Sequence, residues 1–415
     1  MQASRPLLVE EDVRAPVCYL LHLSLDSTKT NDRLPFADDP TASTTYKLLD
    51  AGAFNITYQD NSGASGDYIS DVLTIGGVSI NSLEMGLAKS ATLITGLLGI
   101  GYDKNEASDG LASGSFVYPS IIDTMVSQGL IATKAYSLFL DDLESSTGSI
   151  IFGGLDTNKF QGELVSLPVV PEHFQNGTAI YLDLSVNMTS FSVTGEAKNT
   201  TSLLDDNTKT SFVEFPALLD SGTSLTYLPT DLAGNLFALI GAYDDTQSSG
   251  QVFVDCAVDT KSPDQTFNFG FGGSAGASTA TIKVPMSEMI FPLTGLFATP
   301  SQYVPSAKSL GYSQVCALGL QSGGSGPFLL GDTFLRSAYV VYDLTNNVIG
   351  IAQTNFNSTT ASVTDFSATA TALPSISGVA VSTAVAKKSA ASASSTFSVW
   401  SAVSLGVGAA FVTLA

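Results

Sequence analysis

One short stretch of this chain is suited to acid-base chemistry, the tetrapeptide Asp220-Ser221-Gly222-Thr223. Apolar residues before it indicate a buried strand that ends at the aspartate, and Gly222 permits a sharp turn beneath the carboxylate. Ser221 and Thr223 place hydroxyl donors beside the ionised form of the acid. This chemistry requires a second carboxylate. When two acids share one site, only one of them ionises readily, so one gives a proton while the other accepts one. The alternative reading is an ordinary Asp-Ser-Gly turn after a strand.

Other motifs must hold such a turn in place, and they occur in a recognisable order. They are Gly96–Tyr102, Ile150–Asp156, Phe328–Leu335 and Tyr339–Asp343. Together with the tetrapeptide they resemble the pepsin-like aspartic proteases, in particular the fungal cell-surface branch of yapsins and candidapepsins. The resemblance extends from about Phe36 to about Phe356. It implies that Phe328–Leu335 contains a strand crossing beside the catalytic loop and that Gly96–Tyr102 is the equivalent strand of the first lobe.

The resemblance also implies a hairpin flap that closes over substrate, with Tyr58 as the flap tyrosine. Alternating side chains before Tyr58 and the Asn-Ser-Gly run after it predict a hairpin by themselves. Gln59 and Asn61 stand where the family often has glycines. Because asparagine tolerates left-handed backbone geometry, the turn is expected to be preserved. A simple surface hairpin is the alternative.

The strand expected to carry the first catalytic aspartate is missing. The family has Asp-Thr-Gly-Ser before the flap, followed closely by a tryptophan, and nothing between Met1 and Tyr58 fits. The nearest candidate is Asp26, but Thr28 occupies the glycine position and a β-branched residue resists that turn. We therefore interpret Asp26 as a solvated loop acid. The single tryptophan, Trp400, lies far away near the C-terminus.

Residues 1–33 show neither a secretory signal nor the family pattern. The rest of the chain nevertheless has features typical of secreted proteins. Cys256 and Cys316 are spaced consistently with the family disulfide of the second lobe, which implies an oxidising compartment, and Cys18 is left over. Glycosylation sequons are present at five positions, which are Asn55, Asn176, Asn187, Asn199 and Asn357.

The C-terminal composition predicts a stalk and an anchor. Residues 357–396 are rich in Ser, Thr and Ala and are expected to form an extended stalk. The apolar segment 397–415 follows a spacer of small residues, which is the pattern of a lipid-anchor signal with attachment near Ser389. A permanent transmembrane helix is the alternative, disfavoured because no basic residues follow the segment.

The N-terminal and C-terminal segments therefore give conflicting indications, because a lipid anchor requires entry into the secretory pathway and residues 1–33 show no secretory signal. We expect that the first exon or two are missing or misassigned in this sequence. The open alternative is a true product that has lost its first active-site strand. A transcript that starts in frame at Met1, with no longer form, would favour the alternative.

Composition excludes several other functions. The 415 residues are 44% hydrophobic and carry a net charge of -21, which makes nucleic-acid binding implausible and suits acid surroundings. The two histidines, His22 and His173, have no nearby cysteine or motif partner, so a metal site or a catalytic triad is not expected. No glycine-rich phosphate loop is present, and no cofactor is implied.

We therefore predict an all-β, bilobal, pepsin-like fold with two β-barrel-like lobes, the first lacking its opening strands. The first lobe covers residues 34–165 and the second covers residues 166–356. The resemblance implies an endopeptidase that cleaves polypeptides at acid pH as a monomer held on the cell surface by a lipid anchor. Asp220 would supply one carboxylate, and the chain as written would be poorly active because the other is unassigned. Two alternatives are a non-catalytic cell-surface protein with a peptide-binding groove and, less favoured, a dimer pairing two copies of Asp220.

Overall fold

The computed structural model describes the chain in segments, and the expectations for Asp26, Cys18, Trp400 and the tail 397–415 lie outside them. The described residues are 7–12, 43–58, 62–92, 96–110, 117–145, 147–195, 198–204, 213–260, 264–272, 279–293 and 304–381.

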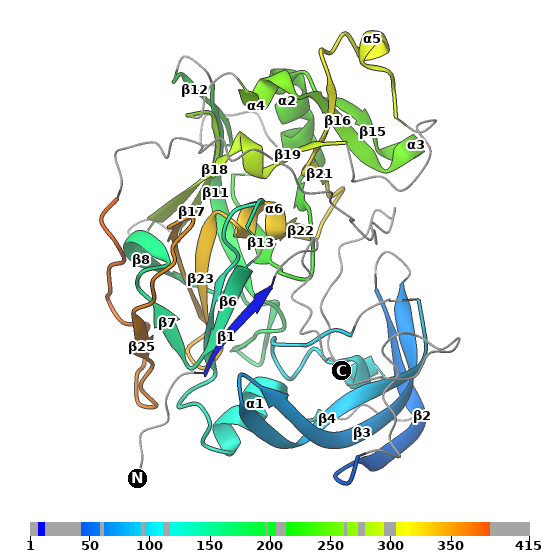
Figure 1. Ribbon diagram of the computed structural model, residues 1–415, viewed down its shortest axis with the longest axis vertical. Helices are drawn as coiled ribbons and strands as arrows, with labels where there is room; N and C mark the ends of the chain where they lie inside the picture. Colours follow the sequence, from blue (N-terminus) through cyan, green and yellow to red (C-terminus); the bar gives the residue numbers. More distant parts are fainter. Residues whose placement is uncertain are drawn as a thin grey trace.

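A three-stranded antiparallel sheet forms most of the described first lobe (Figure 1). Its strands are β2 (Lys47–Thr57), β3 (Gly63–Ile75) and β4 (Val78–Ala91), in that order. Gly76 and Gly77, with φ of 53° and 77°, make the tight turn between β3 and β4, a conformation in which glycine carries no steric penalty. A short 3₁₀ segment (Ala107–Gly110) and helix α1 (Ile121–Ser127) complete the described part of this lobe.

A six-stranded antiparallel sheet takes strands from both halves of the chain. Its order is β1-β6-β5-β23-β24-β8. The bounds are Leu7–Asp12 for β1, Ala135–Phe139 for β5, Thr147–Phe152 for β6, Phe160–Pro168 for β8, Ala338–Asp343 for β23 and Val348–Thr354 for β24. The boundary drawn from the sequence between residues 165 and 166 thus falls inside β8. Strand β1, from the segment that fits no family pattern, pairs along the whole of β6.

The second lobe is built on an eight-stranded sheet with the path β18-β17-β11-β13-β22-β14-β21, and β12 pairs with β11. These strands are β11 (Ser185–Thr194), β12 (Thr200–Leu204), β13 (Phe215–Leu219), β14 (Thr226–Leu228), β17 (Thr266–Gly272), β18 (Thr279–Pro285), β21 (Leu320–Ser322) and β22 (Phe328–Leu330). Inward aromatic residues fill its core, among them Phe191, Phe267, Phe269, Phe271 and Phe334, all fully buried. Burial of this apolar area is the main force that holds the lobe together.

Smaller elements cover the second lobe. A four-stranded sheet has the order β15-β16-β20-β19, with β15 at Tyr243–Asp245, β16 at Gln251–Asp255, β19 at Ile290–Pro292 and β20 at Val315–Leu318. The helices are α2 (Thr230–Ile240), α3 (Thr246–Ser249), α4 (Ala257–Thr260), α5 (Ala307–Leu310) and α6 (Asp332–Leu335), with a 3₁₀ turn at Met286–Glu288. Strands β9 (His173–Gln175) and β10 (Thr178–Ile180) form a separate hairpin.

The mostly β, pepsin-like architecture agrees with the sequence prediction, but two details differ. None of the sheets among the described residues closes into a barrel. Gly96–Tyr102, predicted as a strand, is irregular backbone. Its counterpart β22 lies between β13 and β14, whereas no strand of the described first lobe pairs with Gly96–Tyr102. A strand without a partner leaves its backbone donors and acceptors unpaired, so the ladder does not form.

Residues 357–381, here called the strap, are packed against the protein, so the prediction of an extended stalk is wrong for this part. Strand β25 (Val363–Asp365) pairs antiparallel with β7 (Gly154–Asp156), and the pair lies at the left edge of Figure 1. Phe366 and Leu373 are buried at 7% and 8% exposure. Farther along, the amide of Val379 donates to the carbonyl of Phe160 at 2.9 Å. A few spaced apolar residues and a paired main chain therefore suffice to dock a segment that composition marks as unstructured.

Candidate active site

The Asp220 turn begins where two parallel strands end side by side. Strand β13 pairs in parallel with β22, with Leu219 opposite Leu330. The amide of Asp220 continues this ladder by donating to the carbonyl of Leu330 at 3.2 Å. Gly331 follows β22, and a Cβ there would lie 2.1 Å from the carbonyl oxygen of Thr223. Only glycine therefore allows the two turns to pack this closely.

The carboxylate of Asp220 is nearly enclosed, at 6% exposure, and it accepts two hydrogen bonds. Thr223 Oγ1 donates to Oδ2 at 2.6 Å, and the Gly222 amide donates to Oδ1 at 2.8 Å. Ser221, expected as a second hydroxyl donor, is half-buried and does not bond to the carboxylate. Burial raises the pKa of Asp220 to about 6, although the bonds from Thr223 and Gly222 act in the opposite direction. The group can therefore change protonation state in mildly acid solution.

A stacked pair of tyrosines from the six-stranded sheet is bonded to the end of β13, next to this turn. Tyr342 donates its hydroxyl to the carbonyl of Leu219 at 3.3 Å. The Tyr342 ring stacks on Tyr136 with centroids 4.7 Å apart. Burial, and then the charge of Asp220, raises the pKa of Tyr342 well above its ordinary value, so the phenol stays a neutral donor. Strands β23 and β5 thus fix the end of β13 from a different sheet.

Asp332 is a second acid near Asp220, and the sequence argument did not single it out. It follows Gly331 and is only 4% exposed. Its amide donates to the Thr223 carbonyl at 2.8 Å, which holds it against the Asp220 turn. A signal was present in the sequence, because Asp332 stands within the Phe328–Leu335 motif, but its burial depends on tertiary packing.

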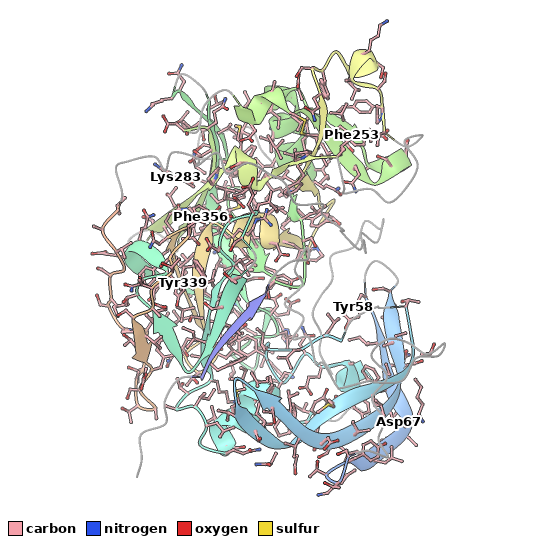
Figure 2. The ribbon with its side chains drawn as sticks, in the orientation of Figure 1. Tyr58, Asp67, Phe253, Lys283, Tyr339 and Phe356 are labelled. Atoms are coloured by element: carbon pink, nitrogen blue, oxygen red, sulfur yellow. A yellow bond between two sulfur atoms is a disulfide. The ribbon has the colours of Figure 1, made fainter. Side chains whose placement is uncertain are left out.

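Tyr58, the expected flap tyrosine, lies in the first lobe (Figure 2). Its amide donates to the carbonyl of Ser62 at 2.8 Å and closes the hairpin between β2 and β3. The side chain is 7% exposed and belongs to an apolar cluster with Phe54, Tyr68 and Tyr118. The structure therefore shows the hairpin, while Gln59 and Asn61 at its tip lie outside the described residues.

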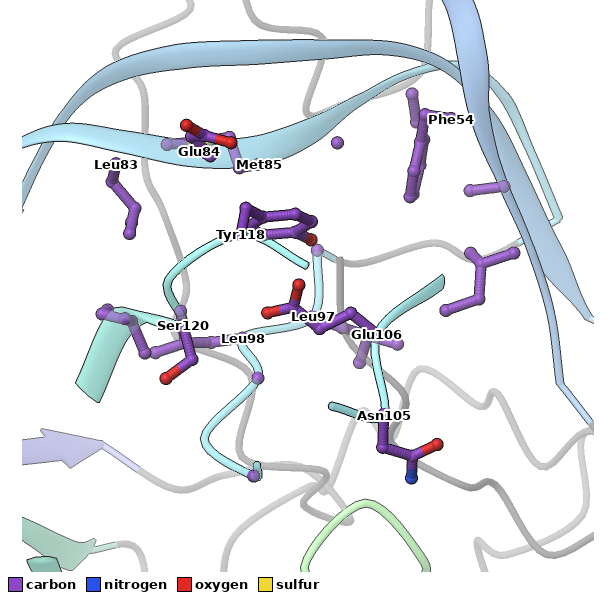
Figure 3. A pocket seen from close by; sticks show the side chains of 18 of the residues that line it. Phe54, Leu83, Glu84, Met85, Leu97, Leu98, Asn105, Glu106, Tyr118 and Ser120 are labelled. Carbon is purple, nitrogen blue, oxygen red and sulfur yellow. The ribbon is translucent and has the colours of Figure 1, made fainter. Parts of the chain in front are cut away.

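A cavity of about 230 Å³ lies beneath the three-stranded sheet, separate from Asp220. Figure 3 shows Tyr118 and Leu97 beneath the strand that carries Leu83 and Met85. The irregular segment that begins at Gly96 forms another wall. Its lining is mostly apolar by area, although Glu84, Glu106 and Tyr118 also line it, and it does not include Asp220.

The other predicted residues lie in different parts of the protein, away from the Asp220 turn. Cys256 and Cys316 form a disulfide, with Cα atoms 5.1 Å apart, that joins the end of β16 to β20. Asn187 is half-buried within β11, whereas the other sequon asparagines, Asn55, Asn176, Asn199 and Asn357, are exposed. Within the described segments no cluster of three or more His, Cys, Asp or Glu side chains could hold a metal ion. Nor does any helix there have the length and apolar character needed to span a bilayer.

Comparison with protein families identifies the family to which this site belongs. The model of the family described as eukaryotic aspartyl protease matches residues 36–354. This chain belongs to that family. The match contains the Asp220 turn, β22 and the hairpin of β2 and β3, so it confirms the resemblance inferred from the motifs.

Several fungal members of the aspartyl protease family are similar to this chain. The probable aspartic-type endopeptidase opsB of Aspergillus fumigatus is 38% identical, over 82% of this chain and 64% of the relative. The acid protease of Saccharomycopsis fibuligera is 39% identical, over 77% of this chain and 71% of the relative. Barrierpepsin of Saccharomyces cerevisiae is 34% identical, over 76% of this chain and 48% of the relative. The chain thus spans less than two thirds of the length of opsB.

A solved structure supports the fold. The aspartic proteinase from Irpex lacteus superimposes with a TM-score of 0.57, covering 86% of this chain and 91% of that one, at 21% sequence identity. At this identity the likeness concerns the fold alone.

Proposed function

We propose that this protein is an aspartic endopeptidase that hydrolyses peptide bonds in polypeptides at acid pH. The observation that carries the proposal is the enclosed Asp220 carboxylate, with its pKa raised to about 6 by burial, at the end of the parallel pair β13 and β22. An acid in this state can exist in either protonation form at acid pH, as general acid-base catalysis requires. The family membership supplies the reaction class.

In the proposed reaction Asp220 is one of two carboxyl groups that share a water molecule. One carboxylate takes a proton from the water as it attacks the peptide carbonyl, and the protonated partner donates to the carbonyl oxygen. Thr223 and Gly222 would hold Asp220 in one orientation through both its oxygens. Asp332 is not the partner in this proposal, because both of its carboxyl oxygens are buried away from solvent.

Tyr58 would close over bound substrate from the hairpin of β2 and β3. The hairpin supports this role because its closing bond, between the Tyr58 amide and the Ser62 carbonyl, holds the tyrosine next to the hairpin tip. The substrate would lie between this hairpin and the Asp220 turn, with its extended backbone bound by main-chain groups.

A cleavage assay on the purified chain tests the proposal. Wild-type protein, Asp220→Asn and the control Asp365→Asn, an exposed acid on the strap, are incubated with a mixed peptide library between pH 3 and 6. We expect Asp220→Asn to lose about 10²-fold or more of the activity, as for removal of an acid-base group, while Asp365→Asn retains it. Equal activity of Asp220→Asn and wild type refutes the assignment. Peptide binding by wild type without any cleavage favours the non-catalytic peptide-binding protein instead.

We also propose that the protein acts outside the cell, attached to its surface. The disulfide between Cys256 and Cys316 supports an oxidising compartment. Four sequons have exposed asparagines, which is what attachment of a glycan requires. The sequence pattern of residues 397–415, which follow a spacer of small residues, supports a lipid anchor.

A further inference from the structure

The peptide group that joins Leu219 to Asp220 is held at both of its polar atoms. The hydroxyl of Tyr342 donates to its carbonyl oxygen, which belongs to Leu219, at 3.3 Å. Its amide, which belongs to Asp220, donates to the carbonyl of Leu330 at 3.2 Å. Because a peptide group is planar, one bond at each of these atoms fixes its rotation. The direction in which the Asp220 side chain leaves the end of β13 depends on that rotation.

These two bonds come from different sheets of the protein. The bond to Leu330 continues the pairing of β13 with β22, and any residue except proline at position 220 could make it. The bond from Tyr342 crosses from β23 in the six-stranded sheet, and it needs a hydroxyl donor at that one position. Tyr342 is therefore the part of this arrangement that depends on a particular side chain.

Tyr342 is itself firmly placed. Its backbone lies within β23, opposite Tyr136 of β5 on one side and Ile349 of β24 on the other. The side chain is buried, and its ring stacks on the ring of Tyr136 with centroids 4.7 Å apart. A donor that packing already holds in place loses little further freedom when it forms a hydrogen bond. Tyr342 thus gives the end of β13 a rigid point of attachment.

The hydroxyl of Tyr342 stays a donor while the protein is folded. Burial, followed by the charges of Asp220 and Asp332, raises the pKa of Tyr342 well above its ordinary value. Only the protonated phenol can donate to a carbonyl oxygen. The bond to Leu219 is therefore available whether Asp220 is protonated or ionised.

We propose that Tyr342 is a positioning residue for Asp220. Its hydroxyl fixes the Leu219–Asp220 peptide group and so sets the direction of the Asp220 carboxyl group toward substrate. Orientation of a reacting group is a large part of catalysis, and a displacement of about 1 Å can lower a rate by about 10²-fold. The catalytic consequence rests on the proposed function of Asp220. The immobilisation of the peptide group is independent of that function, because it follows from bonds within the folded chain.

Tyr339 provides a matched control on the same strand, and Figure 2 labels it. It is buried in the apolar cluster on the other face of β23, where its ring stacks on Phe160 at 5.0 Å. Its hydroxyl accepts a hydrogen bond from the Asp156 amide at 2.7 Å. Tyr342→Phe and Tyr339→Phe each remove one buried hydroxyl and keep one stacked ring. Their effects on global stability should be similar, but only Tyr342→Phe removes a bond to the Asp220 peptide group.

Amide hydrogen exchange on the full chain tests the proposal residue by residue. In Tyr342→Phe we expect the Asp220 amide to exchange about three- to tenfold faster than in wild type, beyond any change shared by the other amides of β13. Tyr339→Phe should show no such excess at Asp220. If Tyr342→Phe speeds all the β13 amides equally, the hydroxyl contributes only to global stability and the proposal is overturned. An unchanged Asp220 amide overturns it as well.

A measurement on wild-type protein covers the case in which Tyr342→Phe does not fold. The Asp220 amide is the first after β13, and we expect it to be protected from exchange to about the same degree as the amides within that strand. Exchange at the rate of an unstructured peptide would show that the peptide group is not held, and this result also refutes the proposal.

Steady-state kinetics test the catalytic consequence where peptide cleavage is detected. Tyr342→Phe should lower kcat by about three- to tenfold and leave KM unchanged, because the misdirected carboxyl group affects the reaction and not substrate binding. Tyr339→Phe should retain both constants. An unchanged kcat in Tyr342→Phe, or an equal loss in both variants, overturns the positioning role. If wild-type protein cleaves no peptide, the proposed function fails, and hydrogen exchange still decides whether Tyr342 holds the Asp220 peptide group.

Discussion

The hydrogen bond from Thr223 to Asp220 allows a quantitative prediction. Thr223→Val removes the hydroxyl that donates to Oδ2 at 2.6 Å and keeps the side-chain volume. A hydrogen bond to a charged group contributes about 1.5–3 kcal/mol. Since one pKa unit corresponds to about 1.4 kcal/mol, the pKa of Asp220 should rise by about one to two units. Starting from about 6, it would approach about 7 to 8 in the variant.

The assay is a ¹³C NMR titration of the Asp220 carboxyl in wild type and in Thr223→Val. The matched control is Thr226→Val, because Thr226 is a buried hydroxyl three residues farther along that bonds to Thr333 Oγ1 at 2.9 Å and not to the carboxylate. We expect the titration midpoint of Asp220 to move in the first variant and to stay in place in the second. An unchanged midpoint in Thr223→Val, or an equal shift in both variants, refutes the reasoning.

The pH dependence of the unfolding free energy is an independent measure of the hydrogen bond between Thr223 and Asp220. The pKa of Asp220 is raised in the folded protein, so its contribution is present below about pH 4 and declines as the pH rises through about 6. Thr223→Val extends this decline to higher pH. The difference in unfolding free energy between variant and wild type should therefore grow with pH, to about 1.5–3 kcal/mol above pH 8.

Two further predictions concern the periphery of the protein. Deleting residues 357–415 should lower the free energy of unfolding by about 3–6 kcal/mol more than deleting residues 382–415, because only the longer deletion removes the buried side chains of Phe366 and Leu373; equal stability of the two truncations would show that the strap contributes nothing. Mass spectrometry of the protein from a eukaryotic host should find glycan at Asn176, in the exposed turn between β9 and β10, and none at Asn187, whose strand β11 is paired on both sides; glycan at Asn187 would contradict this order.

Much of the second lobe was predictable because its signals are local. The apolar run before Asp220, the glycine after it and the hydroxyl of Thr223 define a strand, a turn and a donor within a few residues. The structure forms each of these. The Phe328–Leu335 motif likewise predicted a strand beside the turn, and β22 pairs with β13 as the resemblance implied.

Predictions failed where a segment depends on a distant partner. Gly96–Tyr102 has a sequence similar to that around β22, yet it stays irregular because strand formation needs a neighbouring backbone. The strap reads as a polar stalk, yet it is ordered because β7 and β8 offer backbone groups and apolar surface close to it. Composition counts apolar residues but does not show what surface they meet.

The sequence by itself determined the family, the mostly β architecture and the chemical identity of Asp220 with its donors, since these depend on residue types at fixed spacing. Tertiary structure alone decided how far the pKa of Asp220 is raised, and it alone made Asp332 a buried acid whose carboxyl oxygens have no hydrogen-bond partner. The physical reason is that desolvation is set by everything packed around a carboxyl group. For Asp220 those surroundings include β22 and β23, which lie more than a hundred residues later in the chain, and for Asp332 they include the turn that carries Asp220.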